Sequence, residues 1–227
     1  MKFQDFEKIM SMPRMIRYTT ACNSNTKRAM TLYRLNLRLS QELFTVISCF
    51  EIALRNNIDI CYTNYYGNNW LRDAITQGGM FDTTNCRRTK QLIDNNLYRL
   101  GHNYTHPKLI AEMDFSFWRY LFAQPQFRAG GQKLLQIFPA KPRSTSSIQY
   151  NQTFIFNQLG LINDIRNRIA HHEPICFISG QPVKNTTYAR QHYTHILQLF
   201  QWMSIDEAAL LYGLDHINTV CMQIDSL

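Results

Sequence analysis

The sequence has no hydrophobic run long enough to cross a membrane. The longest apolar candidate, from Leu43 to Phe50, ends at Glu51, whereas a membrane-spanning helix needs about 18 or more apolar residues. The beginning of the chain, from Met1 to Glu7, contains acidic residues where a signal peptide would have its apolar stretch. We therefore expect a cytoplasmic protein without a membrane partner.

Paired cysteines are also missing. The six cysteines show no C-x-x-C pair and no framework spacing, which argues against a disulfide scaffold and a zinc cluster. No H-E-x-x-H pattern occurs, and the adjacent His171 and His172 do not have the spacing of metal ligands. We predict no metal and no cofactor, and most cysteines as small core residues. The cysteines are Cys22, Cys49, Cys61, Cys86, Cys176 and Cys221.

Acidic residues are in the minority. The chain has 24 lysines and arginines against 16 acidic residues, a formal net charge of +8. Such a surplus suits a polyanionic partner such as RNA, because cationic side chains neutralise phosphates. At 227 residues and 45% hydrophobic composition, the chain can bury the core of one domain or of two small ones, which excludes a disordered protein as the default.

Proline and glycine are absent from Thr26–Tyr65, which predicts one long helix with a possible bend or break near Leu39–Ser40. Apolar residues recur there at helical spacing and form one stripe. The stripe consists of Leu43, Ile47, Phe50, Leu54, Ile58 and Cys61. Glu51 flanks this stripe and Arg55 follows it by four residues, so the simplest expectation is an ion pair within the helix.

The remaining pattern is also helical. Further helices are predicted at residues 84–100, 148–170, 186–203 and 205–221, with a polar loop at 140–147 and a short extended piece at 175–178. Phe115, Trp118 and Phe122 have helical spacing and are expected in the core. Residues 1–25 are expected to form a short helix or a strapped arm rather than a core element. The sequence thus predicts an all-α protein with an N-terminal arm, 1–25, and a single domain, 26–227.

Cationic, amide and imidazole groups gather at the predicted end of the 148–170 helix. Arg166, Asn167 and His171 follow the pattern R-N-x-x-x-H, which resembles the motif of HEPN-type nucleotide-binding and ribonuclease domains. The longer string RNRIAHHEPI resembles the Abi-like (abortive infection) family within that superfamily. Matching landmarks are Phe50–Asn56, Tyr66–Gly67, Trp70–Leu71, Phe117–Trp118 and Phe138–Pro139. The resemblance covers roughly residues 28–205 and implies a HEPN-like helical bundle with additional helices.

The resemblance also implies an activity. It implies a metal-independent endoribonuclease, in which the ribose 2′-hydroxyl attacks the adjacent phosphate, and a role in phage defence or as a toxin restrained by an antitoxin or an inhibitory RNA. His171 suits proton transfer, and Arg166 suits the charged phosphate. Asn167 would orient the imidazole, and Arg168 or His172 would hold backbone phosphates. Glu173, Glu51 and Arg55 are the expected supporting residues.

The spacing of Arg166 and His171 sets a geometric problem. Residues five apart lie about 140° apart around an ideal helix, so one regular helix cannot point both at one phosphate. Either the helix unwinds before His171, or two copies meet in a homodimer with a composite site, as the resemblance implies. Arg166 falls inside the apolar stripe of its helix and needs an acidic partner, for which Glu51 is the candidate.

Two other functions remain open at this stage. A non-catalytic RNA-binding module could bind RNA in the same basic cleft without cutting it. A purely structural interaction domain would neither bind nor cut RNA. A histidine pair before Pro174 can also serve only as a helix cap on a solvated surface.

Overall fold

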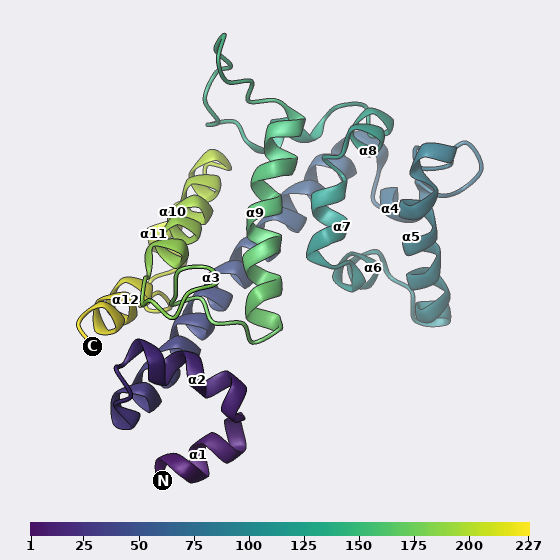
Figure 1. Ribbon diagram of the computed structural model, residues 1–227. Helices are drawn as coiled ribbons and strands as arrows, with labels where there is room; N and C mark the ends of the chain where they lie inside the picture. The colour runs from purple at the N-terminus through teal and green to yellow at the C-terminus, as the bar shows by residue number, and fades with distance from the viewer. The chain divides into compact units, whose positions relative to one another are not determined.

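The computed structural model describes residues 1–227 and divides the chain into two compact units. The first unit contains residues 1–48, 164–198 and 207–227, and the second contains 49–163 and 199–206. Regular structure is helical throughout, so the predicted all-α class is confirmed (Figure 1). The predicted extended piece forms only an isolated bridge between Phe177 and Lys184. No helix combines the length and the apolar character that crossing a membrane demands.

The N-terminal residues of the first unit form helices α1 (Phe3–Met10) and α2 (Met12–Ala21). The expectation that they lie outside the core was wrong, because Met15 is fully buried and Tyr18 is only 2% exposed. The Tyr18 ring packs edge-on against Tyr33 and Phe177, with centroid distances of 5.1 and 5.0 Å. Buried aromatic surface therefore holds this segment in place. A domain boundary at residue 25 stays a prediction.

The long helix predicted from Thr26 is α3 (Thr26–Tyr66), and every member of its predicted stripe is buried. It ends at Gly67, whose φ of 89° is the left-handed conformation expected of a terminating glycine. The break considered near Leu39–Ser40 does not occur. Leu39 and Leu43 are both fully buried, so packing overrides the weaker helix propensity of the serine between them.

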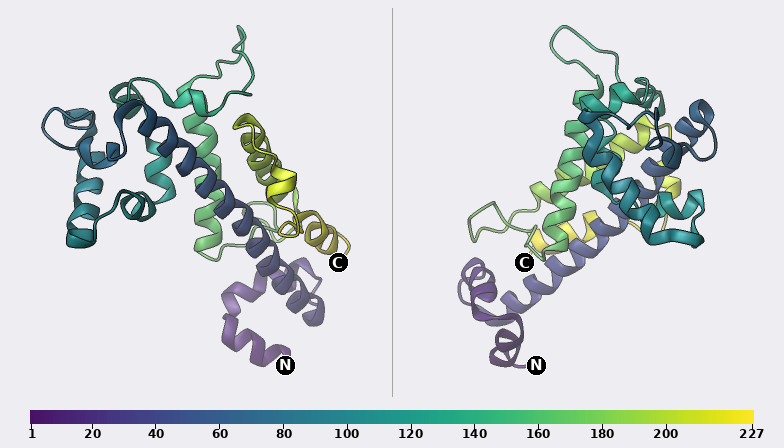
Figure 2. Two further views of the ribbon diagram at one scale, coloured as in Figure 1. Left: turned by 180° about the vertical axis from the view of Figure 1, so that it is seen from behind. Right: turned by 90° about the vertical axis from the view of Figure 1, so that its right-hand side faces the viewer.

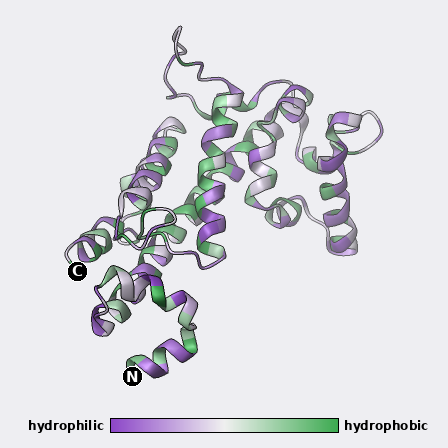
Figure 3. Cartoon of the chain, in the orientation of Figure 1, coloured by the Kyte–Doolittle hydropathy of each residue, from purple (hydrophilic) through white to green (hydrophobic).

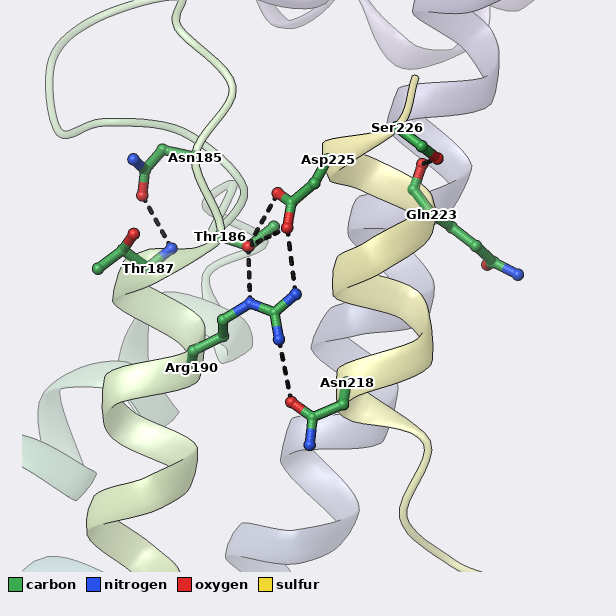
Figure 4. Close-up of polar contacts among 8 residues, drawn as sticks. All are labelled: Asn185, Thr186, Thr187, Arg190, Asn218, Gln223, Asp225 and Ser226. Atoms are coloured by element: carbon green, nitrogen blue, oxygen red, sulfur yellow. Dashed lines mark hydrogen bonds and ion pairs between the residues drawn. The ribbon is translucent and has the colours of Figure 1, made fainter.

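The first unit also contains most of α10 (Thr187–Trp202), together with α11 (Glu207–Leu210) and α12 (Ile217–Asp225). The single helix predicted at 205–221 was wrong, because the chain turns at Gly213, whose φ is 73°. Arg190 ties α10 to α12: its guanidinium donates to Asn218 and Asp225, each at 3.1 Å, and to Thr186 (Figure 4).

The second unit is built from short helices around aromatic side chains. These are α4 (Trp70–Asp73), η1 (Thr84–Cys86), α5 (Arg87–Leu100), η2 (Gly101–Asn103), α6 (His106–Glu112), α7 (Phe115–Tyr120), α8 (Gln124–Ala129) and η3 (Leu134–Ile137). Phe115, Trp118 and Phe122 are fully buried, which confirms their predicted core role. Phe50 packs against Phe115 and Phe200, with ring centroids 6.4 and 5.2 Å apart.

Helix α9 (Gln152–Ala170) is the predicted motif helix and begins four residues later than predicted. Asn151 precedes it, and the Asn151 side chain accepts a hydrogen bond from the Phe154 amide at 3.0 Å, which caps the first turn. The polar segment before it is an irregular loop, as predicted, and extends beyond the start of α9 (Figure 2). The last turns of α9 are largely hydrophilic (Figure 3).

All six cysteines are free thiols, and all but Cys49 are buried, which confirms them as small core residues. Burial raises the pKa of Cys176 to about 12, so this thiol stays protonated at neutral pH.

Candidate functional site at the end of helix α9

Helix α9 ends in a backbone reversal centred on His172. The His171 amide still donates to the Asn167 carbonyl at 2.9 Å, as in a regular helix. His172 has a φ of 56°, in the left-handed region. The His172 and Glu173 amides then donate to carbonyl oxygens three and five residues earlier, at 2.9 and 2.8 Å. This is the Schellman arrangement, with histidine at the position that glycine usually occupies.

The reversal comes too late to bring Arg166 and His171 together. Because regular hydrogen bonding reaches His171, the two side chains remain about 140° apart around the axis. Unwinding before His171, one of the two arrangements considered from the sequence, is therefore not found. Asn167 and His171 are four residues apart on one face, and both are exposed, whereas Arg166 is half-buried. The composite site across a dimer stays a prediction.

Arg168 is bound to the segment that leaves the helix. Its guanidinium donates to the Pro174 carbonyl at 2.9 Å and to the Glu173 carboxylate at 3.3 Å. It also stacks over the Tyr188 ring, 4.6 Å from the centroid. These contacts hold the exit of α9 against α10, while the phosphate contact expected of Arg168 stays a prediction.

A second imidazole group lies beside this arginine. The rings of Tyr188 and His192 have centroids 4.3 Å apart, and both belong to α10. Burial, together with the nearby His195 and Arg168, lowers the pKa of His192 to about 4. His192 is therefore neutral at physiological pH. The i, i+4 spacing of Tyr188 and His192 was readable in the sequence, but nothing there linked the pair to the end of α9.

Residues from the N-terminal helices also position the motif. The Arg14 guanidinium donates to the His172 carbonyl at 3.2 Å. The buried side-chain oxygen of Asn36, on α3, accepts a hydrogen bond from the Ile175 amide at 2.9 Å. More than a hundred residues separate each pair in the chain, so no local pattern predicted these contacts. They fix the backbone on the far side of the reversal.

Glu51 and Arg55 lie on α3, within the second unit, and both are half-buried. Their expected pairing within the helix and the proposed contact between Glu51 and Arg166 both stay predictions.

The end of α9 thus carries two half-buried guanidiniums, one exposed amide, two exposed imidazoles and one exposed carboxylate. The guanidiniums, the amide and the imidazoles can donate hydrogen bonds to a phosphate, and the imidazoles can also transfer protons. No three histidine, cysteine, aspartate or glutamate side chains are grouped so as to hold a metal ion.

Comparison with known proteins gives one match. A protein-family model described as "Abi-like protein" matches residues 2–176, which is more than half of the chain. The match begins within the N-terminal segment, whereas the resemblance noted from the sequence begins near residue 28. The match ends just beyond the motif at the end of α9. No curated protein and no solved structure matches the chain.

Proposed function

This chain belongs to the Abi-like family, and from that premise we propose that it is a metal-independent endoribonuclease. Family membership associates the chain with abortive infection. We propose that it acts there in the cytoplasm, or as the toxin of a toxin–antitoxin pair, by cutting RNA. The observation that carries the proposal is the placement of Arg166, Asn167 and His171 at the end of α9, beside a fixed backbone reversal.

The proposed reaction is a transesterification within the RNA chain. The 2′-hydroxyl oxygen attacks the neighbouring phosphorus, the bond to the 5′-oxygen breaks, and a 2′,3′-cyclic phosphate remains. A base must remove the 2′-hydroxyl proton, and an acid must protonate the departing oxygen. An imidazole suits both tasks because it titrates near neutral pH. The Arg166 guanidinium would stabilise the charge that develops on the phosphorane oxygens.

A second copy of the chain would supply the missing geometry. Because α9 stays regular as far as His171, the Arg166 and His171 of one copy diverge. A two-fold homodimer that brings two α9 ends together would place two imidazoles and two guanidiniums around one phosphate. The imidazole of one copy would then transfer protons at a phosphate that the guanidinium of the other copy holds. The resemblance to HEPN domains supports this arrangement.

The remaining predicted residues would assist. Asn167 shares a face with His171 and would orient its ring, while Glu51 would hold the Arg166 guanidinium. His172, Arg168 and Glu173 would contact backbone phosphates or shape the rim, and Arg55 would support Glu51. The net charge of +8 favours RNA as the partner. An antitoxin or an inhibitory RNA would restrain the enzyme until infection.

Incubation of the purified chain with end-labelled RNA in EDTA tests the proposal. We expect cutting in the presence of the chelator, products that end in a 2′,3′-cyclic phosphate, and loss of cutting in Arg166→Ala and His171→Ala. The matched controls are Arg143→Ala and His102→Ala, two exposed residues of the second unit that should cut like the parent.

The same experiment separates the enzyme from a non-catalytic RNA-binding module. Salt-dependent binding without cutting would assign the chain to the module and overturn the nuclease. A chain that neither cuts nor binds RNA would overturn both.

A further inference from the structure

The second unit contains a cavity that the proposed nuclease motif does not use. Its volume is about 590 Å³, within the range of roughly 300–1,000 Å³ that is typical of small-molecule sites. It lies among α5, α7 and α8, and its apolar lining includes Leu92, Phe117, Tyr120 and Pro125. Phe117 is buried, while Leu92 and Tyr120 are about half exposed at the rim. The cavity therefore offers aromatic and aliphatic walls to a ligand that enters from solvent.

One wall of the cavity contains a buried amide with spare hydrogen-bonding capacity. Gln126 is only 8% exposed, and its Nε2 donates to the Thr89 hydroxyl at 3.0 Å. No protein group donates to the Gln126 Oε1. If the amide were rotated by half a turn, Thr89 would donate to the oxygen and the amide N–H groups would need an acceptor instead. In either orientation, one end of Gln126 remains for a ligand, and a buried polar atom without a partner is costly.

A cation stands at the rim of the cavity. Arg88 lies in the first turn of α5, where a positive charge opposes the helix dipole. The neighbouring Lys90 is bound by Asp82 at 2.6 Å, but Arg88 is exposed, lines the cavity and has no acidic partner. The cavity also contains the Asp114 carboxylate, which accepts from the Phe117 amide at 2.8 Å and can accept further N–H groups. Arg88 can therefore bind an anion at the rim, next to a pocket in which Asp114 and Gln126 offer hydrogen-bond acceptors.

The rim also provides a stacking surface. The Tyr120 ring is 48% exposed and is held edge-on by Phe156, with centroids 5.5 Å apart. The Arg119 guanidinium lies over Phe156, 4.2 Å from the centroid. A tyrosine fixed in this way can stack against a flat ring at a low cost in side-chain entropy.

We propose that this cavity is a nucleotide site that takes a nucleobase against Phe117 and Tyr120, with the attached phosphate at Arg88. A nucleobase fits all of the lining groups: two apolar faces for the aromatic walls, N–H donors for Gln126 and Asp114, and a nearby anion for the guanidinium. A fatty acyl chain would leave the Gln126 amide unsatisfied, and a free phosphate would leave the aromatic walls unused.

The nucleotide can come from two sources, a free mononucleotide or a base turned out of an RNA strand. The second source rests on the proposed nuclease function, because the pocket would then hold part of the substrate or of an inhibitory RNA. The first source does not depend on it.

Calorimetric titration of the full chain with AMP tests the proposal, with adenosine and ribose 5-phosphate as partial ligands. AMP should bind more tightly than either fragment. Gln126→Met keeps the side-chain length but removes the amide, so it should weaken the binding of both AMP and adenosine about tenfold. Tyr120→Ala should weaken the binding of both ligands by about tenfold or more, and Tyr120→Phe should bind both with the affinity of the parent. Arg88→Ala should weaken the binding of AMP, because the phosphate loses its cation, but should leave the affinity for adenosine unchanged.

The matched controls are Arg87→Ala, on the same helix turn but outside the cavity lining, and Tyr98→Ala, a tyrosine that is 89% exposed on α5. Both should bind AMP like the parent. Equal affinity for AMP and ribose 5-phosphate, or unchanged binding in Gln126→Met and Tyr120→Ala, would overturn the nucleotide site, provided that each variant melts with the parent. So would a complete lack of AMP binding.

The two sources are distinguished in the His171→Ala protein, which should not cut. Displacement of AMP by an oligoadenylate strand assigns the pocket to RNA, and AMP binding without displacement assigns it to the free nucleotide. A chain that binds AMP but cuts no RNA would leave the pocket standing and would remove the proposed nuclease.

Discussion

The end of α9 and the cavity beside α5 are opposite kinds of candidate site. The end of α9 is exposed and polar, and it is made of residues contiguous in sequence, from Arg166 to Pro174. The cavity is largely apolar, and its lining comes from α5, α7 and α8. The first was recognised from its motif, whereas the second carries no motif at all. Reactive groups are therefore visible in a sequence, but an enclosed volume becomes visible only when the helices are packed.

The two sites also differ in how they are held. A backbone reversal and long-range hydrogen bonds from Arg14 and Asn36 hold the end of α9 in place. Buried aromatic side chains, among them Phe115 and Trp118, anchor α7, one of the helices that line the cavity. At the end of α9, a single substitution can therefore remove a reactive side chain without removing the hydrogen bonds that hold the backbone.

The largest expected effect separates the two adjacent histidines of the motif. His171→Ala should lower the rate of RNA cleavage by about 10²–10⁴, the usual contribution of proton transfer by a positioned side chain. His172→Ala should lower it by less than about tenfold, because His172 mainly shapes the backbone reversal. Single-turnover cleavage in EDTA measures both rates. A larger loss in His172→Ala than in His171→Ala would reverse the assigned roles.

The next effect concerns the buried hydrogen bond behind the motif. Asn36→Ala leaves the Ile175 amide without its acceptor and should lower the free energy of unfolding by about 1–3 kcal/mol. Asn157→Ala, at an exposed position of α9, makes the same change in helix propensity and should not destabilise the protein. Urea denaturation measures the difference. Equal stability of the two variants would show that the Asn36 bond contributes nothing.

The pH dependence of stability should report on His192. Its pKa is lowered from 6.5 to about 4 in the folded chain, chiefly by burial, so the unfolded chain binds the extra proton between these values. The stability that His192 contributes is complete above about pH 6.5 and is lost as the pH falls toward 4. Because His192 is only partly buried, we expect a loss on the order of 1 kcal/mol.

Urea denaturation between pH 7 and pH 4 measures this loss, and His192→Gln is the matched variant without a titrating ring. The parent should lose more stability than His192→Gln over this interval. Identical profiles would contradict a neutral, partly buried His192.

The smallest effect is expected at the left-handed residue. His172→Gly should raise the free energy of unfolding by about 0.5–1 kcal/mol, because glycine adopts a positive φ without the steric cost of a Cβ. His171→Gly, one residue earlier in the helical part, should lower stability by a similar amount. Opposite signs in thermal or urea unfolding support the reversal at His172, and a destabilised His172→Gly would contradict it.

Much of the fold followed from sequence periodicity. The long helix from Thr26 was predicted to within one residue at its end, because its apolar stripe and the terminating Gly67 are local signals. The helix predicted at 205–221 failed because Gly213 was not weighed as a break. The buried role of Met15 was missed, since a short N-terminal segment reveals its partners only when the chain is folded.

The candidate site divides in the same way. The identity of Arg166, Asn167 and His171 came from the motif, and the end of α9 came from Pro174. The left-handed His172 and the contact between Asn36 and Ile175 depend on residues that meet only in the folded chain. The cavity at Gln126 depends on the packing of three helices and left no mark in the sequence.

The central claim is that Arg166 from one copy of the chain acts with His171 from another. Mixing separately purified Arg166→Ala and His171→Ala proteins, after dissociation and reassembly, tests it directly. If the site is composite, neither variant alone cuts RNA, and the mixture regains a measurable part of the parental cleavage rate. A mixture that stays inactive, or a parent chain that cuts RNA as a monomer, would contradict the claim.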